Sequence, residues 1–311
     1  MGRVHDLVAE QWKRVGPEEL HRALGEFHRL QLTPTSDEGD LRADLDHEMR
    51  MRLVEAEFVA SERAAVRPLL GTVPTEASAF VAWFEALEQR GPGQHDPLFD
   101  WLAEHASLAQ MRYFLQQEVG GEAGFEDLVA MVQVKMPTRP KLELARNYWD
   151  EMGQGRERGM HGPLLASLAA ALGVDDTSTR GVAWEPLALG NLMVALASRR
   201  RFAYQALGAL GAIELTAPGR AAKVNDGLRR LGFDGDVRRY FALHATLDVK
   251  HSAAWNHEVL APLVAADPSL ALPIAEGAVL RLSAGARCFE RYKTDLGLTF
   301  DGAGTRRHSR A

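Results

Sequence analysis

The chain has 311 residues, of which 46% are hydrophobic and 25% charged, and its formal net charge at pH 7 is −6. This composition is typical of a globular protein with enough apolar material for a core, and the mild acidity gives no reason to expect nucleic acid or a membrane as a partner. The single cysteine, Cys288, excludes an intrachain disulfide framework, and the N-terminal segment lacks the apolar run of a secretory signal, so we expect a cytoplasmic protein.

The amino-acid sequence favours helix along almost the whole chain. Alanine, leucine, glutamate and arginine dominate, and the alternating apolar pattern of a β-strand is absent. Helix starts are indicated where a proline or a capping residue precedes acids, at Pro17, Ser36 and Pro74. The dipeptide Pro218-Gly219 predicts a helix break. The sequence therefore predicts an all-α protein.

The predicted helices form one unit, because no long linker divides the chain and no repeat of fixed period is present. We expect a single helical domain over residues 1–298, in which residues 1–95 form a partly separate helical layer. Residues 299–311 are small, polar and basic, and we interpret them as a mobile tail.

The first candidate metal ligand lies in residues 111–130, MRYFLQQEVGGEAGFEDLVA. Glu118 follows an apolar stretch and precedes two glycines, which allow a backbone to approach a site closely. Glu122 and Glu126 follow at four-residue spacing, and for these two acids we favour a solvated helix face. Glu118 is therefore the candidate ligand of this segment.

A second candidate region is the segment 146–165, RNYWDEMGQGRERGMHGPLL. It is not a phosphate-binding loop, because the lysine and serine or threonine that end such a loop are missing. Its three glycines predict a helix that ends, bends and restarts, with Asp150, Glu151 and His161 as candidate ligands. A flexible surface loop is the alternative.

Glu214 is the acid that is hardest to explain as a solvated side chain. It ends the apolar run FAYQALGALGAIE, where a carboxylate is costly unless it is paired or bound to a metal. A contact with a nearby helix terminus is the alternative explanation.

The fourth segment, residues 240–255, holds His244, Asp248 and His251 at spacings of four and three. On a helix these side chains fall within a stripe of roughly 60°. A buried carboxylate between two histidines requires compensation, which a metal ion supplies. The alternative is a salt-bridged helix whose histidines fill space in the core.

Together these segments supply a mixed set of oxygen and nitrogen ligands. Its members are Glu118, Glu151, Glu214, Asp248, His161, His244 and His251. The four carboxylates would balance two divalent cations, and such a set suits iron or manganese. The paired Glu-x-x-His motifs of ferritin-like proteins are absent, which disfavours that fold.

From about Pro97 to Arg291 the chain resembles the heme-oxygenase-like diiron oxidases, also called the iron-containing redox enzyme family. The resemblance is strongest in four motifs: FLQQE at Glu118, NYWDEMGQGRERGMH over 147–161, GALGAIE at Glu214, and HATLDVKH over 244–251. It implies a heme-oxygenase-like helical bundle with a buried dinuclear metal site.

The resemblance also implies the ligands. Matched by motif, they are Glu118, His161, Glu214, His244, Asp248 and His251. Glu151, ten residues before His161, is similar to an extra carboxylate ligand of the N-oxygenating members. Many other members carry a histidine at the position of Phe125, so the chain departs from the pattern of the desaturases and decarboxylases.

The activity that the resemblance implies is a non-heme, O2-dependent oxygenase reaction. It would use two Fe ions, O2 as cosubstrate and an external electron donor, and would N-oxygenate an amine or guanidine-type nitrogen of a small metabolite through a peroxo-diferric intermediate. We expect a reductase partner and a homodimer. A diiron desaturase or C–C-cleaving oxidase is the alternative, followed by a non-redox binding protein.

Side chains next to the ligand motifs are candidates for substrate contacts. The aromatic and amide residues are Asn147, Tyr148, Trp149 and Trp255, for which we favour a core role. Three arginines, Arg146, Arg156 and Arg158, could hold a substrate carboxylate in a bidentate pair, although we favour solvated side chains.

Overall fold

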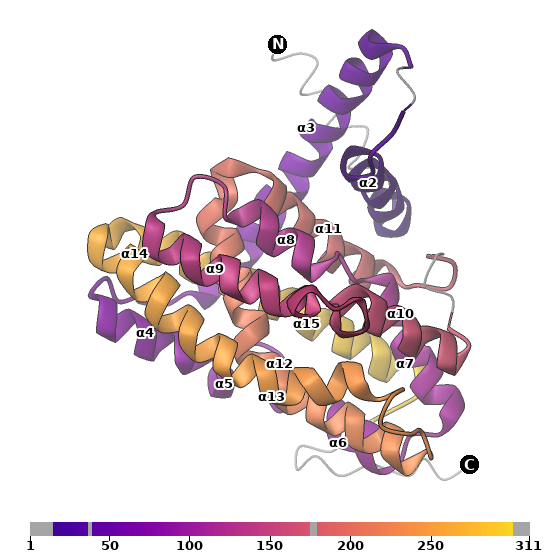
Figure 1. Cartoon of the computed structure of the whole chain (residues 1–311). Helices are drawn as coiled ribbons and strands as arrows, with labels where there is room; N and C mark the ends of the chain where they lie inside the picture. The colour runs from indigo at the N-terminus through magenta and orange to yellow at the C-terminus, as the bar shows by residue number, and fades with distance from the viewer. Residues whose placement is uncertain (1–14, 37–38, 175–178, 301–311) are drawn as a thin grey trace.

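A computed structural model describes residues 15–36, 39–174 and 179–300, and these residues form helices and no β-strand (Figure 1). The all-α prediction is therefore confirmed. The α-helices are α2 (Pro17–Leu32), α3 (Leu41–Val66), α4 (Ala77–Glu85), α5 (Leu87–Arg90), α6 (Pro97–Glu104), α7 (Leu108–Gly120), α8 (Phe125–Val132), α9 (Thr138–Glu151), α10 (His161–Leu172), α11 (Trp184–Ser198), α12 (Ala203–Arg230), α13 (Arg239–Ala254), α14 (Ala261–Ala266) and α15 (Ala271–Asp295). A six-residue π-helix, η5 (Trp255–Leu260), joins α13 to α14.

Local signals explain where several helices begin. Pro17 opens α2, as predicted, because a proline at the first turn loses no hydrogen bond. The side chain of Glu76 caps α4 by accepting from the N–H groups of Ser78 and Ala79. The start predicted at Ser36 is displaced, because Asp40 caps α3 instead. A proline in α2 and capping side chains in α3 and α4 thus fix these helix ends to within a few residues of the expected positions.

Helix α12 lies at the centre of the bundle and packs against α6, α13 and α15. It continues through Pro218, so the predicted break at this position is wrong. Packing along the whole helix outweighs the one backbone hydrogen bond that a proline removes. Gly208 and Gly277 allow α12 and α15 to cross closely, because a Cβ atom on either would lie 1.8 Å from a carbonyl oxygen of the other helix.

The core consists of two groups of buried apolar side chains. The larger joins residues of α2, α3, α4, α8, α11, α12, α14 and α15. The smaller joins α6, α7 and α10 to the C-terminal parts of α12 and α15, and it includes Cys288. Burial raises the pKa of the Cys288 thiol to about 12, as befits a packing residue.

In Figure 1, α2 and the first half of α3 project from the rest of the bundle. Leu24, Phe27 and Phe58 of these helices nevertheless belong to the larger core group. The limits of the domain, 1–298, stay a prediction. Of the predicted tail, residues 301–311 lie outside the described part of the chain.

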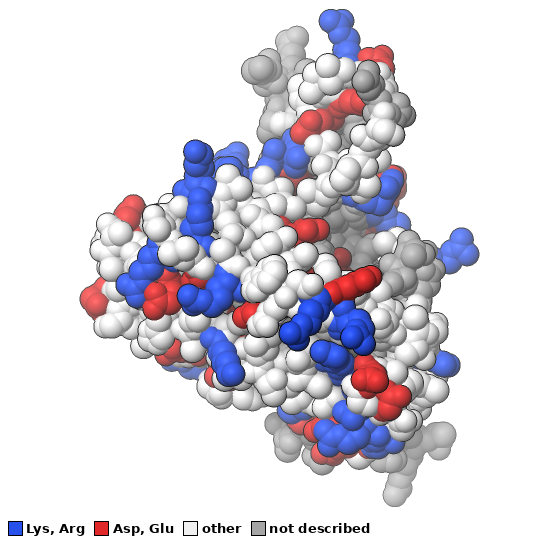
Figure 2. Space-filling model, in the orientation of Figure 1, with Lys and Arg blue, Asp and Glu red and all other residues white. Residues whose placement is uncertain are grey.

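The described surface carries charges of both signs. Figure 2 shows lysines and arginines interspersed with aspartates and glutamates over one face. Within the described part of the chain, no helix is both long and apolar enough to cross a membrane.

Candidate metal centre

Four helices bring six of the predicted ligands together. Glu151 ends α9 and His161 begins α10, while Glu214 lies in the middle of α12. The remaining three, His244, Asp248 and His251, lie on α13. All six side chains are buried except that of His244, which is partly exposed.

The loop between α9 and α10 turns the chain back on itself. Met152 and Met160 form an isolated antiparallel bridge, and Gly153 adopts a φ of 60°. A Cβ atom on Gly153 would lie 2.5 Å from the backbone of Gly159, so the turn requires glycine here. The predicted bend is therefore present, and it places His161 Nδ1 3.2 Å from Glu151 Oε2.

The first group of potential ligand atoms is formed by Glu151, His161 and His244. His244 Nε2 lies 3.1 Å from His161 Nδ1 and 3.9 Å from Glu151 Oε2. His244 Nδ1 donates to the carbonyl oxygen of Tyr240 at 2.7 Å. This hydrogen bond fixes the ring and leaves the lone pair of Nε2 directed at the group.

The second group is formed by Glu151, Asp248 and His251. His251 Nδ1 lies 3.6 Å from Glu151 Oε1 and 3.5 Å from Glu214 Oε2. Within the described part of the chain, neither His251 Nδ1 nor Asp248 Oδ1 has a hydrogen-bond partner, although both atoms are buried. Unpaired polar atoms in a buried position are costly, and a bound cation would satisfy both of them.

Two polar residues support the second group from outside. Asp150, a candidate ligand in the sequence, instead has its Oδ2 atom 3.3 Å from His251 Nε2, on the far side of the ring from Nδ1. Asn147 Nδ2 donates to Glu214 Oε1 at 2.6 Å. Such outer hydrogen bonds hold a ligand's free atom in a set direction.

The electrostatics of the protein without metal also fit a cation site. Burial, followed by repulsion from Glu214 and Glu151, raises the pKa of Asp248 to about 10. Burial opposes a charge on His161 and His251, but hydrogen bonds and the neighbouring carboxylates raise the pKa of each to about 9. The raised pKa values show that the site favours added positive charge, and the mixed N/O donor set fits iron.

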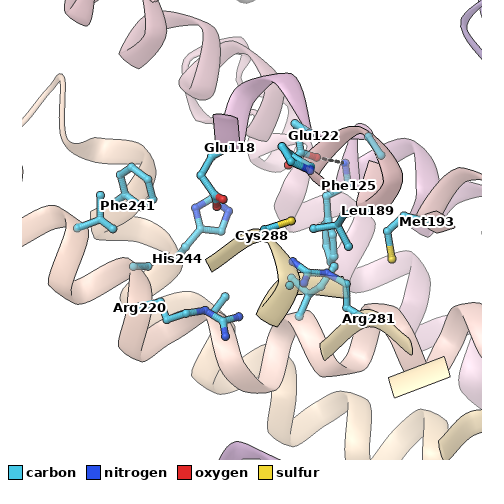
Figure 3. A pocket seen from close by; sticks show the side chains of 18 of the residues that line it. Glu118, Glu122, Phe125, Leu189, Met193, Arg220, Phe241, His244, Arg281 and Cys288 are labelled. Atoms are coloured by element: carbon cyan, nitrogen blue, oxygen red, sulfur yellow. Dashed lines mark hydrogen bonds between the residues drawn. The ribbon is translucent and has the colours of Figure 1, made fainter. Parts of the chain in front are cut away.

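Glu118 lies outside both groups. It projects from α7 into a cavity of about 170 Å³ that the ligand clusters also line (Figure 3). Its Oε1 accepts a hydrogen bond from Tyr292 Oη at 3.0 Å. The carboxylate is open to the cavity but enclosed by protein, and this burial raises its pKa. Its role as a ligand stays a prediction.

The solvated face that we favoured for Glu122 and Glu126 is wrong for Glu126, whereas Glu122 is exposed and lies in the loop between α7 and α8. Glu122 lines the cavity, and its Oε1 lies 3.9 Å from His161 Nε2. Glu126 Oε1 accepts from the N–H of Gly162, and its Oε2 is buried without a partner among the described residues. The break before Phe125 turns α8 back toward α10, which the four-residue spacing alone could not reveal.

The side chains flanking the ligand motifs do not line the cavity. Trp255 is buried, and its Nε1 donates to the carbonyl oxygen of Leu207, whereas Trp149 is exposed. Arg156 and Arg158 are exposed, and the largely exposed side chain of Arg146 pairs with Glu143. The cavity is lined instead by two arginines that the sequence did not single out, Arg220 and Arg281.

Comparisons with known proteins point to one family. Residues 112–286 match the family described as iron-containing redox enzymes. The curated 4-chloro-allylglycine synthase of Streptantibioticus cattleyicolor is 34% identical over 116 residues, which cover 35% of this chain and 42% of that enzyme. The chain thus matches about two fifths of the length of this curated relative.

Two solved structures, both of a CADD-like protein of unknown function from Nostoc punctiforme, are similar in fold. The structure at 2.00 Å resolution gives a TM-score of 0.48 at 20% identity and covers 78% of this chain and 97% of that one. The structure at 1.35 Å resolution gives a TM-score of 0.46 at the same identity. Because the family match covers more than half of the 311 residues, the protein belongs to the iron-containing redox enzyme family, with its all-α, heme-oxygenase-like fold.

Proposed function

We propose that the protein is a non-heme diiron oxygenase that uses O2 to oxidise a nitrogen atom of a small metabolite. The observation that carries the dinuclear site is the position of Glu151. Its Oε2 atom faces His161 and His244, while its Oε1 atom faces His251. One carboxylate is therefore shared by two groups of ligand atoms, as expected of a residue between two metal ions.

The residues have distinct parts in this proposal. Glu151, His161 and His244 would hold one ion, and Glu151, Asp248 and His251, joined by Glu214, the other. Iron bound there would supply the activation of O2 and the transfer of electrons. The backbone carbonyl of Tyr240 keeps His244 in the correct tautomer, and the Tyr240 hydroxyl lies 3.3 Å from His161 Nε2, within hydrogen-bond distance.

Oxidation at nitrogen is supported by the Glu-x9-His pattern of Glu151 and His161, which resembles the N-oxygenating members of the family. The cavity volume of about 170 Å³ also favours a small substrate, because a cavity of roughly 150 Å³ accommodates a molecule of the size of benzene. Electrons from an external donor, delivered by a reductase, would return the irons to the ferrous state.

A second candidate is favoured by the curated relative, whose name states that its product is an unsaturated amino acid. A desaturase or C–C-cleaving oxidase would use the same ligands but would remove hydrogen or break a carbon–carbon bond. A non-redox binding protein is disfavoured, because the family consists of redox enzymes.

The decisive experiment is anaerobic loading with Fe(II) followed by exposure to ¹⁸O2 with candidate amines and guanidines. Mössbauer spectroscopy should show coupled iron pairs, and mass spectrometry should show a product that carries ¹⁸O on nitrogen. Only mononuclear iron after full loading would contradict the dinuclear site. A product that has lost two hydrogens or a carbon fragment, without ¹⁸O, would replace N-oxygenation by the second candidate.

A further inference from the structure

Two arginines enter the cavity without forming an ion pair with any described residue, although both lie in the field of Glu118. Arg220 comes from α12 and Arg281 from α15, and Figure 3 shows both on one side of the cavity, with Glu118 and Glu122 on the other. Arg220 Nη2 donates to Thr216 Oγ1 at 2.8 Å. Within the described part of the chain, Arg281 donates no hydrogen bond, and neither arginine forms an ion pair.

This arrangement costs stability, because a guanidinium group taken out of water needs an anion or several acceptors. Burial, followed by repulsion from Arg281, lowers the pKa of Arg220 to about 10. The Arg220 guanidinium is also held above the rings of Phe99 and Phe289, at 5.8 and 5.5 Å from their centroids. It is thus positioned and charged but only partly satisfied.

Compensation of Glu118 does not account for both arginines. Tyr292 already donates to Glu118, and one carboxylate cannot neutralise two guanidinium groups. The charges that line the cavity can be counted, once two ferrous ions are included. Two ferrous ions and two arginines would carry six positive charges. The five carboxylates that line the cavity carry five negative charges, and they are those of Glu118, Glu122, Glu151, Glu214 and Asp248. One positive charge is left over, and it lies on the side of the arginines.

We propose that Arg220 and Arg281 bind the carboxylate of the substrate and thereby direct its other end toward the histidine cluster. The inference rests on the proposed function, and it narrows the substrate to a small amino carboxylate. The planar fork of an arginine matches the two oxygens of a carboxylate, which a carboxamide cannot reproduce. The substrate anion also supplies the missing negative charge.

The test is equilibrium binding by calorimetry under nitrogen, with the Fe(II)-loaded and the metal-free protein. The probes are L-lysine, L-arginine and 6-aminohexanoate, each compared with its own carboxamide. At least one acid should bind the Fe(II)-loaded protein about tenfold or more tightly than its amide, and the preference should be smaller in the metal-free protein, whose cavity lacks the charges of the iron. Equal affinity of acids and amides, or no binding of any acid, would overturn the proposal.

Variants then assign the effect to the arginines. Arg281→Gln and Arg220→Gln should each weaken the acid about tenfold or more without changing the affinity for the amide. Arg281→Lys keeps the charge in a side chain of similar length and should lose only part of the affinity for the acid. This variant keeps the proposal testable if the glutamine variants fail to fold. Arg156→Gln, an exposed arginine, is the matched control. Unchanged acid binding in Arg281→Gln and Arg281→Lys would refute the assignment.

The outcomes separate this inference from the proposed function. Selective binding of acids by a protein that holds a single iron would support the role of the two arginines and contradict the dinuclear site. Two bound irons and transfer of ¹⁸O to nitrogen, without a preference for acids over amides, would support the proposed function and contradict the role of the two arginines.

Discussion

Glu151 is the residue on which both groups of ligand atoms depend. Glu151→Gln keeps the shape of the side chain but removes the charge and one of the two coordinating oxygens. We expect the chain to bind about one Fe(II) or fewer in place of about two, with the affinity for the second ion reduced tenfold or more, on the order of the loss seen for supporting residues. Anaerobic titration with Fe(II), followed by Mössbauer spectroscopy, measures both quantities.

The control for this variant lies on the same helix. Glu143→Gln removes a buried carboxylate of α9 that pairs with Arg146 and belongs to neither group. It should keep the iron stoichiometry of the unmodified protein. Equal iron binding by Glu151→Gln and Glu143→Gln would place Glu151 outside the metal centre.

His21 gives a second residue-scale prediction, on the dependence of stability on pH. Burial, followed by the positive charge of Arg287, lowers the pKa of His21 to about 4, and its ring packs against Phe58 and Trp184. Above pH 6.5 the imidazole is neutral in the folded and the unfolded chain. As the pH falls from 6.5 to 4, the unfolded chain takes up a proton that the folded chain excludes, so stability is lost.

The variant His21→Phe removes this titration and keeps an apolar ring in the core. Between pH 6.5 and 4 it should lose less free energy of unfolding than the unmodified protein, by up to about 3 kcal/mol. Urea denaturation at several pH values measures the difference. Parallel pH profiles of the two proteins would show that His21 does not titrate with a lowered pKa.

At the scale of elements, the loop between α9 and α10 is the part that assembles the site. Gly153→Ala places a Cβ atom against the backbone of Gly159 at a positive φ. We expect a loss of about 2–3 kcal/mol in the free energy of unfolding and weaker iron binding, because Glu151 and His161 would be pushed apart. Denaturation and Fe(II) titration of the same sample test both effects.

A glycine of α12 provides a control for which we expect a gain in stability rather than a loss. Gly219 has open space around its Cα atom and no positive φ. Gly219→Ala should therefore stabilise the protein by about 0.5–1 kcal/mol and leave iron binding unchanged. If Gly153→Ala raised the free energy of unfolding as Gly219→Ala should, the close contact between Gly153 and Gly159 would be contradicted.

At the scale of the whole molecule, folding and iron binding should be linked. A ligand that binds only the folded state at 100 times its Kd stabilises that state by about 2.7 kcal/mol. Fe(II) should accordingly raise the unfolding temperature under nitrogen, since iron bound at the proposed centre would join side chains of α9, α10, α12 and α13.

The variant Asp248→Asn separates metal-linked stability from the stability of the fold. Burial and the carboxylates of Glu214 and Glu151 raise the pKa of Asp248 and so favour its neutral form, which asparagine resembles; in the metal-free protein the variant should therefore be about as stable as the unmodified protein. The gain on adding Fe(II) should be largely lost. Calorimetric scans with and without Fe(II) test this, and a full Fe(II)-dependent gain in the variant would exclude Asp248 as a ligand.

Local patterns were sufficient for the all-α class, for the face of α13 and for the bend near Glu151. Helix periodicity places His244, Asp248 and His251 on one stripe whatever surrounds them, and glycine spacing marks a turn because only glycine adopts it without strain. These features depend on steric interactions between residues that are close in the sequence, so they can be predicted without knowledge of the tertiary structure.

Long-range packing decided the rest. Pro218 remains inside a helix because neighbouring helices hold α12 on both sides of it, and Glu122 faces His161 because α8 turns back toward α10. Arg220 and Arg281 are 61 positions apart in the sequence, and no local pattern distinguishes them from solvated arginines. Only the close crossing of α12 and α15, which glycines on both helices permit, brings their charges to one cavity, since burial and charge balance are properties of the packed molecule.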